Sequence, residues 1–157
     1  MSKKLITYYL TLSQVFPSTH CRAGEPTGFK DSLRKTKLHT IRANYDFWAR
    51  RFEKIAAGEA VLSIREWVGK PYGKGSTQRE ICRLTRDDGI GLQRLDFANG
   101  TLSSAWIDFS NHLIKTCIKP ELLARNDGLS LNDWREWFMG YDLSKPMAII
   151  HFTKFRY

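Results

Sequence analysis

The short segment KLHTIR, from Lys37 to Arg42, holds residue types that could do chemistry at close spacing. If the segment is a strand, Thr40 and Arg42 share one face, and His39 lies on the other. In a regular strand, Lys37 would lie on the same face as His39. Its side chain can approach Thr40 only if Lys37 lies at the entrance of the strand, where the pleat does not fix the direction of a side chain. A desolvated lysine beside a threonine hydroxyl can lose its proton and act as a base toward that nucleophile. From these residues alone, an ordinary strand with solvated ends is the favoured interpretation, with His39 as a structural residue.

A second group of candidates lies in the segment REWVGKPYGKGSTQR, where cationic and aromatic side chains are interleaved. Cations pair with phosphates and aromatic faces stack on unpaired bases, so this composition suits single-stranded nucleic acid. An equally good interpretation is a solvated hairpin whose aromatic rings pack inward. The candidate nucleic-acid-binding residues are Arg65, Trp67, Lys70, Tyr72, Lys74 and Arg79.

The glycines of this segment do not make a nucleotide triphosphate loop. A P-loop has a glycine, four further residues and then Gly-Lys-Ser/Thr. Here Val68 stands at the first of these positions, and Gly75 follows Lys74 where serine or threonine is required. A strand is also expected after the loop, rather than a helix whose N-terminus could hold phosphate.

The composition narrows the class of partner. Lys and Arg number 25 against 16 Asp and Glu, which gives a formal net charge of +9. This excess favours phosphate-bearing partners, first nucleic acid and then an anionic membrane surface, with a generically basic protein as the alternative. The three cysteines form no C-x-x-C pair, which excludes a disulfide framework and a zinc finger or ribbon. The four histidines are scattered, so we expect no metal site and no cofactor.

The N-terminal segment MSKKLITYYLTL imitates a signal peptide, because two lysines precede an apolar run. Its threonines and tyrosines, and the lack of a small-x-small cleavage site, argue against that interpretation. No window approaches the roughly 18–20 apolar residues that a membrane span needs. We therefore expect a soluble, reduced, cytoplasmic protein without a membrane partner.

Hydrophobic periodicity and turn residues predict one domain over residues 1–157. Asp88-Gly89 and Asn99-Gly100 favour tight hairpin turns, which predicts an antiparallel meander of three strands. The expected fold is α+β: a strongly curved, mostly antiparallel sheet or small β-barrel with three or four flanking helices. Strands are predicted at 5–12, 37–42, 60–67, 78–86, 90–97, 102–109 and 147–155. Helices are predicted at 29–36, 45–57, 121–125 and 131–139.

The order and spacing of several short motifs resemble an ASCH domain, a family of the PUA-like superfamily. They are K-x-x-T-I-R on a strand, Gly58 before AVLSIREW, the helix start D-G-L-S-x-x-D-W, and the final strand I-I-H-F-T. The resemblance runs from about residue 28 to residue 155. It implies a small β-barrel with a cleft beside the K-x-x-T-I-R strand. PUA-like domains are typically readers of RNA or modified bases, so the resemblance implies RNA or a modified nucleoside as the partner.

One branch of small bacterial ASCH proteins hydrolyses the acetyl amide of N4-acetylcytidine with a lysine, a threonine and an acidic residue. Carried over by motif, these residues fall on Lys37, Thr40 and Asp127, and Arg42 is the candidate stabiliser of the oxyanion. Taken alone, Asp127 is typical of a turn before Gly128. It also stands where that branch has glutamate, and a shift of about 1 Å can cost roughly a hundredfold in rate.

Three functions of different classes follow. The favoured one is a nucleic-acid-associated domain that binds single-stranded RNA or a modified nucleotide beside the K-x-x-T-I-R strand. The first alternative is an amidohydrolase that deacylates N4-acetylcytidine-type nucleosides. The second is a protein-interaction module that uses exposed tryptophan and tyrosine rings.

Overall fold

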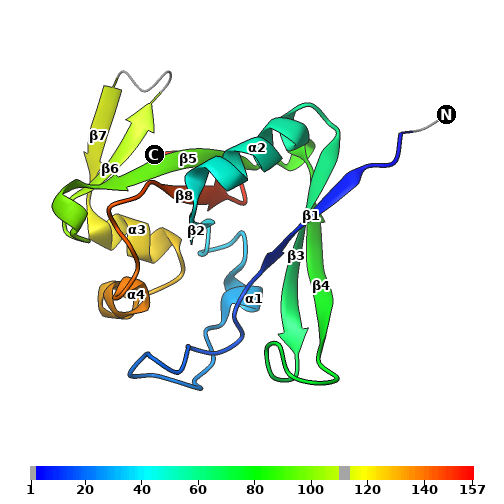
Figure 1. The fold of residues 1–157 in the computed structure, drawn as a ribbon, viewed down its shortest axis with the longest axis horizontal. Helices are drawn as coiled ribbons and strands as arrows, with labels where there is room; N and C mark the ends of the chain where they lie inside the picture. Colours follow the sequence, from blue (N-terminus) through cyan, green and yellow to red (C-terminus); the bar gives the residue numbers. More distant parts are fainter. Residues whose placement is uncertain (1–2, 110–113) are drawn as a thin grey trace.

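A computed structural model describes residues 3–109 and 114–157, and its strands form two sheets (Figure 1). The three-stranded sheet has the order β1-β3-β4, and the five-stranded sheet has the order β2-β8-β5-β6-β7. In the smaller sheet, β1 (Ile6–Thr11) runs parallel to β3 (Ala60–Val68), and β4 (Thr77–Leu84) runs antiparallel to β3. The larger sheet is antiparallel throughout and consists of β2 (His39–Ala43), β5 (Gly91–Phe97), β6 (Ala105–Phe109), β7 (Ile114–Ile118) and β8 (Met147–His151).

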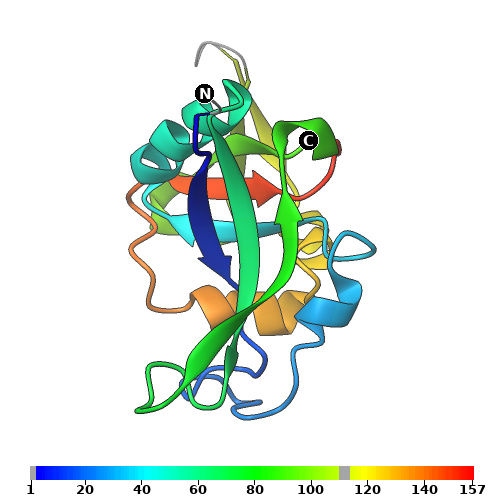
Figure 2. The same ribbon diagram turned by 90° about the vertical axis from the view of Figure 1, so that its right-hand side faces the viewer.

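Four α-helices accompany these sheets in the described part of the chain: α1 (Phe29–Ser32), α2 (Tyr45–Ala56), α3 (Pro120–Asn126) and α4 (Leu131–Phe138). The strands of the two sheets cross each other, as the view in Figure 2 shows. Helix α2 packs against both sheets, whereas α3 and α4 pack against each other below the larger sheet in Figure 1. The α+β class and the mostly antiparallel pairing are therefore confirmed.

Strand β8 separates two hydrophobic cores, which explains why MAIIH is apolar at every position before the histidine. Ala148 and Ile150 belong to a core shared by both sheets and α2, while Met147 and Ile149 belong to a second core against α3 and α4. Adjacent residues of a strand point to opposite faces, so a strand that is covered on both sides needs apolar residues throughout.

Helix α2 follows the predicted local pattern closely. Asn44 is its N-cap and accepts a hydrogen bond from the Phe47 backbone N–H, and the chain turns away at Gly58 with a positive φ of 74°. Trp48, Phe52 and Ile55 are buried along one face. The predicted stripe of apolar residues thus anchors α2 to the shared core.

The hairpin predicted at Asp88-Gly89 is wrong, because β4 and β5 belong to different sheets. Thr85 instead caps a short 3₁₀ turn, and the Asp88 carboxylate accepts a hydrogen bond from the Thr85 backbone N–H at 2.8 Å. The turn at Asn99-Gly100 does join β5 to β6, although β6 begins at Ala105 rather than at residue 102. Strand β7 was not predicted, since its side chains are mostly exposed and carry no core pattern.

The predicted closed barrel is not confirmed and stays a prediction. Among residues 3–109 and 114–157, the strands pair as two separate sheets without a ladder that joins them into one cylinder. Within the same residues, no helix is long and apolar enough to cross a membrane.

Candidate functional site

The structure brings together the four residues predicted for catalysis, beginning with Lys37 and Asp127. The Lys37 ammonium donates hydrogen bonds to the Asp127 carboxylate and to the Asp127 backbone carbonyl, both at 2.7 Å. It also lies 3.9 Å from the centre of the Phe29 ring. A backbone hydrogen bond of 2.7 Å from Leu38 to the Asn126 carbonyl holds the two segments together.

Lys37 occupies this position because it precedes β2 by two residues, so the pleat of the strand does not set its direction. Asp127 is the C-cap of α3, and Gly128 follows with a positive φ of 80°. A Cβ at Gly128 would stand 3.1 Å from the Lys37 Cβ, which is closer than ordinary packing allows. The glycine thus serves both the turn and the approach of the lysine stem.

Burial acts against the charge of both partners. It lowers the pKa of Lys37 and raises the pKa of Asp127, and in each case the charge of the partner opposes the shift. Both side chains are almost fully enclosed, with 1% of Lys37 and 3% of Asp127 exposed. A lysine whose pKa is lowered by desolvation is suited to proton transfer.

Thr40 and Arg42 lie on the same face of β2, as the strand parity predicted. Arg42 donates one hydrogen bond to the Thr40 hydroxyl at 3.0 Å and another to the backbone carbonyl of Thr11 at 2.8 Å. Both residues line a small cavity together with Lys37 and Asp127. This cavity, which we call the niche, has a volume of about 20 Å³, room for roughly one water.

The walls of the niche include residues that the sequence analysis did not identify. Phe29, Leu129 and Trp137 form apolar sides, and Leu12 and Ser13 also line it. Only Leu129 stands in one of the quoted motifs, because the walls come from segments that are distant in the sequence.

A much larger groove of about 820 Å³ adjoins the niche. One wall comes from residues 12–28, the connection from β1 to α1 that we call the strap; the other comes from the loop between β3 and β4. Both lie at the same end of the molecule in Figures 1 and 2. Leu12 and Ser13 line the groove as well as the niche, so the two spaces share a wall.

The predicted nucleic-acid-binding residues divide between this groove and other surroundings. Trp67, Lys70 and Tyr72 line the groove, and the rings of Trp67 and Tyr72 lie 4.9 Å apart at 55°. Lys74 is exposed on the same loop but does not line the groove.

Arg65 and Arg79 are engaged elsewhere. The Arg79 guanidinium pairs with the Glu66 carboxylate at 2.6 Å, and the Arg65 guanidinium lies 4.9 Å from the centre of the Tyr9 ring. Neither arginine lines the groove, because each is held by a residue on a neighbouring strand.

The strap is fastened to α4 by three consecutive residues. His20 hydrogen-bonds with the Asp133 backbone carbonyl at 3.2 Å, the Cys21 backbone N–H donates to Glu136 at 3.2 Å, and Arg22 pairs with the Asp133 carboxylate at 2.6 Å. The buried His20 ring also packs on Phe16. These contacts hold the strap against α4.

His20, Cys21 and Glu136 also place three potential metal ligands within 4.8 Å of one another, a spatial coincidence that the sequence does not indicate. However, the Arg22 backbone N–H donates to His20 Nδ1 at 3.0 Å, so the neutral ring carries its proton on Nε2. A metal at Nε2 would have to displace that proton. The hydrogen bond from Cys21 to Glu136 also raises the pKa of the Cys21 thiol. The arrangement favours a fastening of the strap over a cation site.

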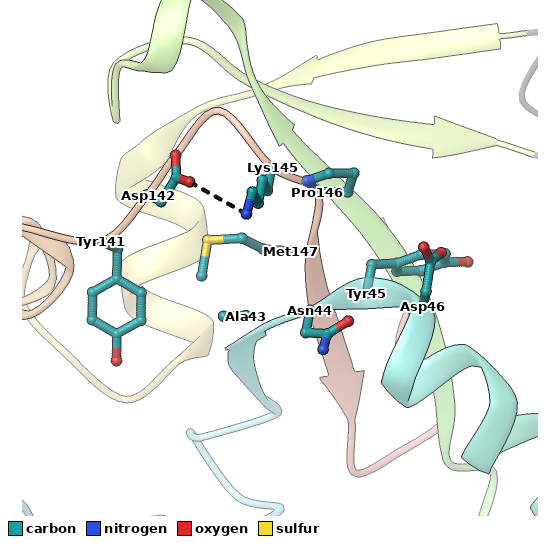
Figure 3. Close-up of a pocket in the computed structure, with 9 residues that line it drawn as sticks. All are labelled: Ala43, Asn44, Tyr45, Asp46, Tyr141, Asp142, Lys145, Pro146 and Met147. Carbon is teal, nitrogen blue, oxygen red and sulfur yellow. Dashed lines mark ion pairs between the residues drawn. The ribbon is translucent and has the colours of Figure 1, made fainter.

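A further pocket of about 410 Å³ lies beyond the end of β2 (Figure 3). Tyr141 and the exposed ion pair of Lys145 with Asp142, at 3.9 Å, stand on one side, and Asn44 and Asp46 at the start of α2 stand on the other. The charged residues that line it are all exposed. It therefore lacks the desolvated groups that distinguish the niche.

No protein-family model, curated protein or solved structure matches this chain. The ASCH resemblance stays a prediction, and the function must be argued from the niche and the groove.

Proposed function

We propose that this protein binds single-stranded RNA or a modified nucleotide in the cytoplasm, with the recognised base directed to Lys37, Thr40, Arg42 and Asp127. The observation that carries the proposal is the burial of an ion pair and a hydroxyl, with a half-buried guanidinium, around one niche beside a large groove. Burying charged groups costs several kcal/mol each before their pairing is counted, and such groups concentrate at functional sites.

The donors and acceptors of the niche match the edge of a base. The Thr40 hydroxyl, the Arg42 guanidinium and the Lys37 ammonium can donate to carbonyl oxygens, and the Asp127 carboxylate can accept from an amino group. The net charge of +9 attracts a polyanion from solution. In this proposal the two crossed sheets correspond to the curved sheet of a PUA-like barrel, with the niche and groove as its cleft.

Binding of fluorescent single-stranded oligoribonucleotides tests the proposal, with and without one N4-acetylcytidine. We expect affinity that falls between about 50 and 200 mM salt, because phosphate contacts release counterions. Arg42→Gln removes a niche donor and should weaken binding, whereas Lys145→Ala removes an exposed cation outside the niche and groove and should have little effect. Salt-insensitive binding, or no binding at low ionic strength, contradicts the proposal.

A second function, amide hydrolysis of an N-acylated pyrimidine nucleoside, is favoured by one observation. Lys37 is buried, its pKa is lowered, and it lines the niche together with Thr40. In this scheme neutral Lys37 takes the Thr40 hydroxyl proton while the oxygen attacks the acyl carbonyl. The resulting oxyanion is stabilised by Arg42, which already donates to the Thr40 hydroxyl.

The rest of the scheme returns the protons and frees the enzyme. The protonated Lys37 gives its proton to the departing amine, with Asp127 as the shuttle, and an acyl-threonine remains. Water then hydrolyses this ester, releasing the carboxylic acid and restoring the Thr40 hydroxyl. For N4-acetylcytidine the products are cytidine and acetate.

Chromatography of N4-acetylcytidine incubated with the protein tests this second function. Thr40→Val keeps the shape of the side chain but removes the hydroxyl, so it should abolish release of cytidine. Thr40→Ser keeps the hydroxyl and should retain a measurable rate. Activity that survives in Thr40→Val excludes the scheme, and folded wild-type protein without activity leaves the niche as a binding site.

A further inference from the structure

Tyr72 is held in an unusual position at the mouth of the groove. Its φ is +58°, in the left-handed region that bulky residues rarely adopt, and 89% of the residue is exposed. Its ring nevertheless lies against Trp67, with the ring centres 4.9 Å apart. The loop between β3 and β4 therefore presents an aromatic face to solvent at the edge of a cavity.

The groove itself is mostly apolar. Phe16 and Pro17 of the strap line it together with Trp67 at the end of β3 and Tyr72 in the following loop, and Lys70 is the cation of the predicted set that lies on the wall. Its volume of about 820 Å³ falls within the range of about 300–1,000 Å³ that is typical of small-molecule sites. An aromatic slot with one cation suits an unpaired base and a single phosphate.

We infer that the groove is a second subsite, which binds the base next to the recognised nucleotide by stacking on Tyr72 and Trp67, with Lys70 contacting one phosphate. The inference rests on the proposed function, because Leu12 and Ser13 place the groove directly beside the niche. The net charge of +9 and the cation of Lys70 complement a nucleotide chain. The preferred ligand is therefore a single-stranded oligonucleotide rather than a free nucleoside, which has no group to fill the groove.

Two quantities follow from this arrangement. Removing an aromatic ring that stacks on a base weakens binding by about 5- to 150-fold. One phosphate contact gives a slope of about −0.7 for log affinity against log salt on a single strand, whereas four contacts would give about −2.8. The groove therefore predicts a strong effect of Tyr72 and a shallow salt dependence.

The experiment measures the affinity of three probes: N4-acetylcytidine, a trinucleotide that contains it, and the unmodified trinucleotide. Tyr72→Gly removes the ring and suits the positive φ, Tyr72→Phe keeps the ring, and Lys145→Ala is the control at an exposed cation outside the niche and the groove. We expect Tyr72→Gly to weaken trinucleotide binding by about 5- to 150-fold and to leave nucleoside binding unchanged. Tyr72→Phe and Lys145→Ala should both bind the trinucleotide nearly as the wild type does.

The outcomes separate this inference from the proposed function. A nucleoside that binds as tightly as the trinucleotide overturns the inference and leaves the niche intact. An unmodified trinucleotide that binds equally well, with the same dependence on Tyr72, supports the groove and shows that the niche does not distinguish the acetyl group. No binding of any probe overturns both, as does a protein partner that persists after nuclease treatment and is lost in Tyr72→Gly.

Discussion

At the scale of single residues, the ion pair of Lys37 with Asp127 is the costliest feature of the site. Both partners are almost fully buried, and the attraction between them is opposed by the desolvation of two charges. Replacing a buried ion pair by well-packed apolar residues is often neutral or stabilising, so the pair is not explained by stability alone. Its place beside Thr40 and the niche supports a role in function.

Replacement of one partner of this ion pair should therefore lower the free energy of unfolding far more than replacement of both. Lys37→Met leaves an unpaired carboxyl in the core, and we expect the free energy of unfolding to fall by about 3–5 kcal/mol. The double variant Lys37→Met with Asp127→Leu should recover most or all of this loss while binding to the niche stays abolished. Urea unfolding measures both, with Lys145→Ala as the exposed control. A single variant as stable as the wild type would show that the pair is not charged and buried.

At the scale of elements, the strap supplies part of the wall of the niche through Leu12 and Ser13. The niche holds about one water, so a base fits only if some of its walls move. The fastening to α4 is partly exposed, because Arg22 and Glu136 reach solvent. Elements held by exposed contacts open locally at lower free energy than the core does.

Arg22→Ala should therefore loosen the strap without unfolding the sheets. The backbone hydrogen bonds of the strap, including those donated by Phe16, Gly24 and Thr27, should open more often. Hydrogen exchange of these amides should become faster than in the wild type, while the amides of β8 keep their rates. Lys35→Ala, outside the strap, is the control. Unchanged exchange in the strap, or a uniform increase across the molecule, would contradict the assigned role of Arg22.

Helix α2 allows a sharper test of local structure, because Asn44 combines a cap with a positive φ of 65°. Asn44→Ala loses the cap, which costs about 0.5–2 kcal/mol, and strains the left-handed backbone by roughly 1–2 kcal/mol more. Asn44→Gly loses the side-chain cap but accepts the backbone, so only a few tenths of a kcal/mol should be lost. Thermal unfolding of the two variants compares these costs. Equal stability of the alanine and glycine variants would mean that the backbone at this position is not strained.

The elements also show what the sequence could predict. The sequence correctly predicts features that act within one turn, such as the cap at Asn44 and the break at Gly128. It does so because the interacting groups are neighbours in the chain. The hairpin at Asp88-Gly89 failed because the same dipeptide also ends a capped 3₁₀ turn, and only the partition of strands between sheets distinguishes the two. The side chains of β7 are mostly exposed, so this strand lacks the apolar pattern by which a strand is predicted.

At the scale of the whole molecule, the same limit applies to the site. The meeting of Lys37 with Asp127 joins residues 90 positions apart, so its prediction depended on the family resemblance rather than on spacing. The strand parity placed Thr40 and Arg42 together because that relation is local. The groove could not be predicted, since its walls come from the strap and the β3–β4 loop and meet only in the folded chain.

A second cluster of buried polar groups links three neighbouring strands of the larger sheet, β2, β8 and β5. His39 and His151 face each other on β2 and β8, with ring centres 5.6 Å apart. The Tyr157 hydroxyl hydrogen-bonds with His39 and with Asn126, and Gln93 hydrogen-bonds with His151. Burial lowers the pKa of His39 well below 6.5 and that of His151 to about 3. Both rings therefore stay neutral in the folded protein at mildly acidic pH.

Because the pKa values of these histidines are lower in the folded than in the unfolded state, we expect the protein to lose stability in mild acid. Below pH 6.5 the unfolded chain takes up protons on both histidines while the folded protein does not, so the free energy of unfolding falls as the pH falls. The contribution of each ring to the free energy of unfolding is fully present above pH 6.5. It declines as the pH falls, down to the pKa of that ring in the folded protein, which for His151 is about 3. Each ring adds a slope of up to about 1.4 kcal/mol per pH unit, or about 2.7 for the pair.

The window between about pH 6.5 and 5 separates histidines from ordinary carboxyl groups, which titrate mainly below it. Urea unfolding at several pH values should show His39→Gln and His151→Gln each reducing the slope by up to about 1.4 kcal/mol per pH unit, with the largest reduction near pH 5. The matched control is Lys154→Gln, which removes an exposed charge near the same end of the sheet without touching the histidines. A slope that both histidine variants leave unchanged would mean that the rings become protonated inside the fold, in conflict with their burial.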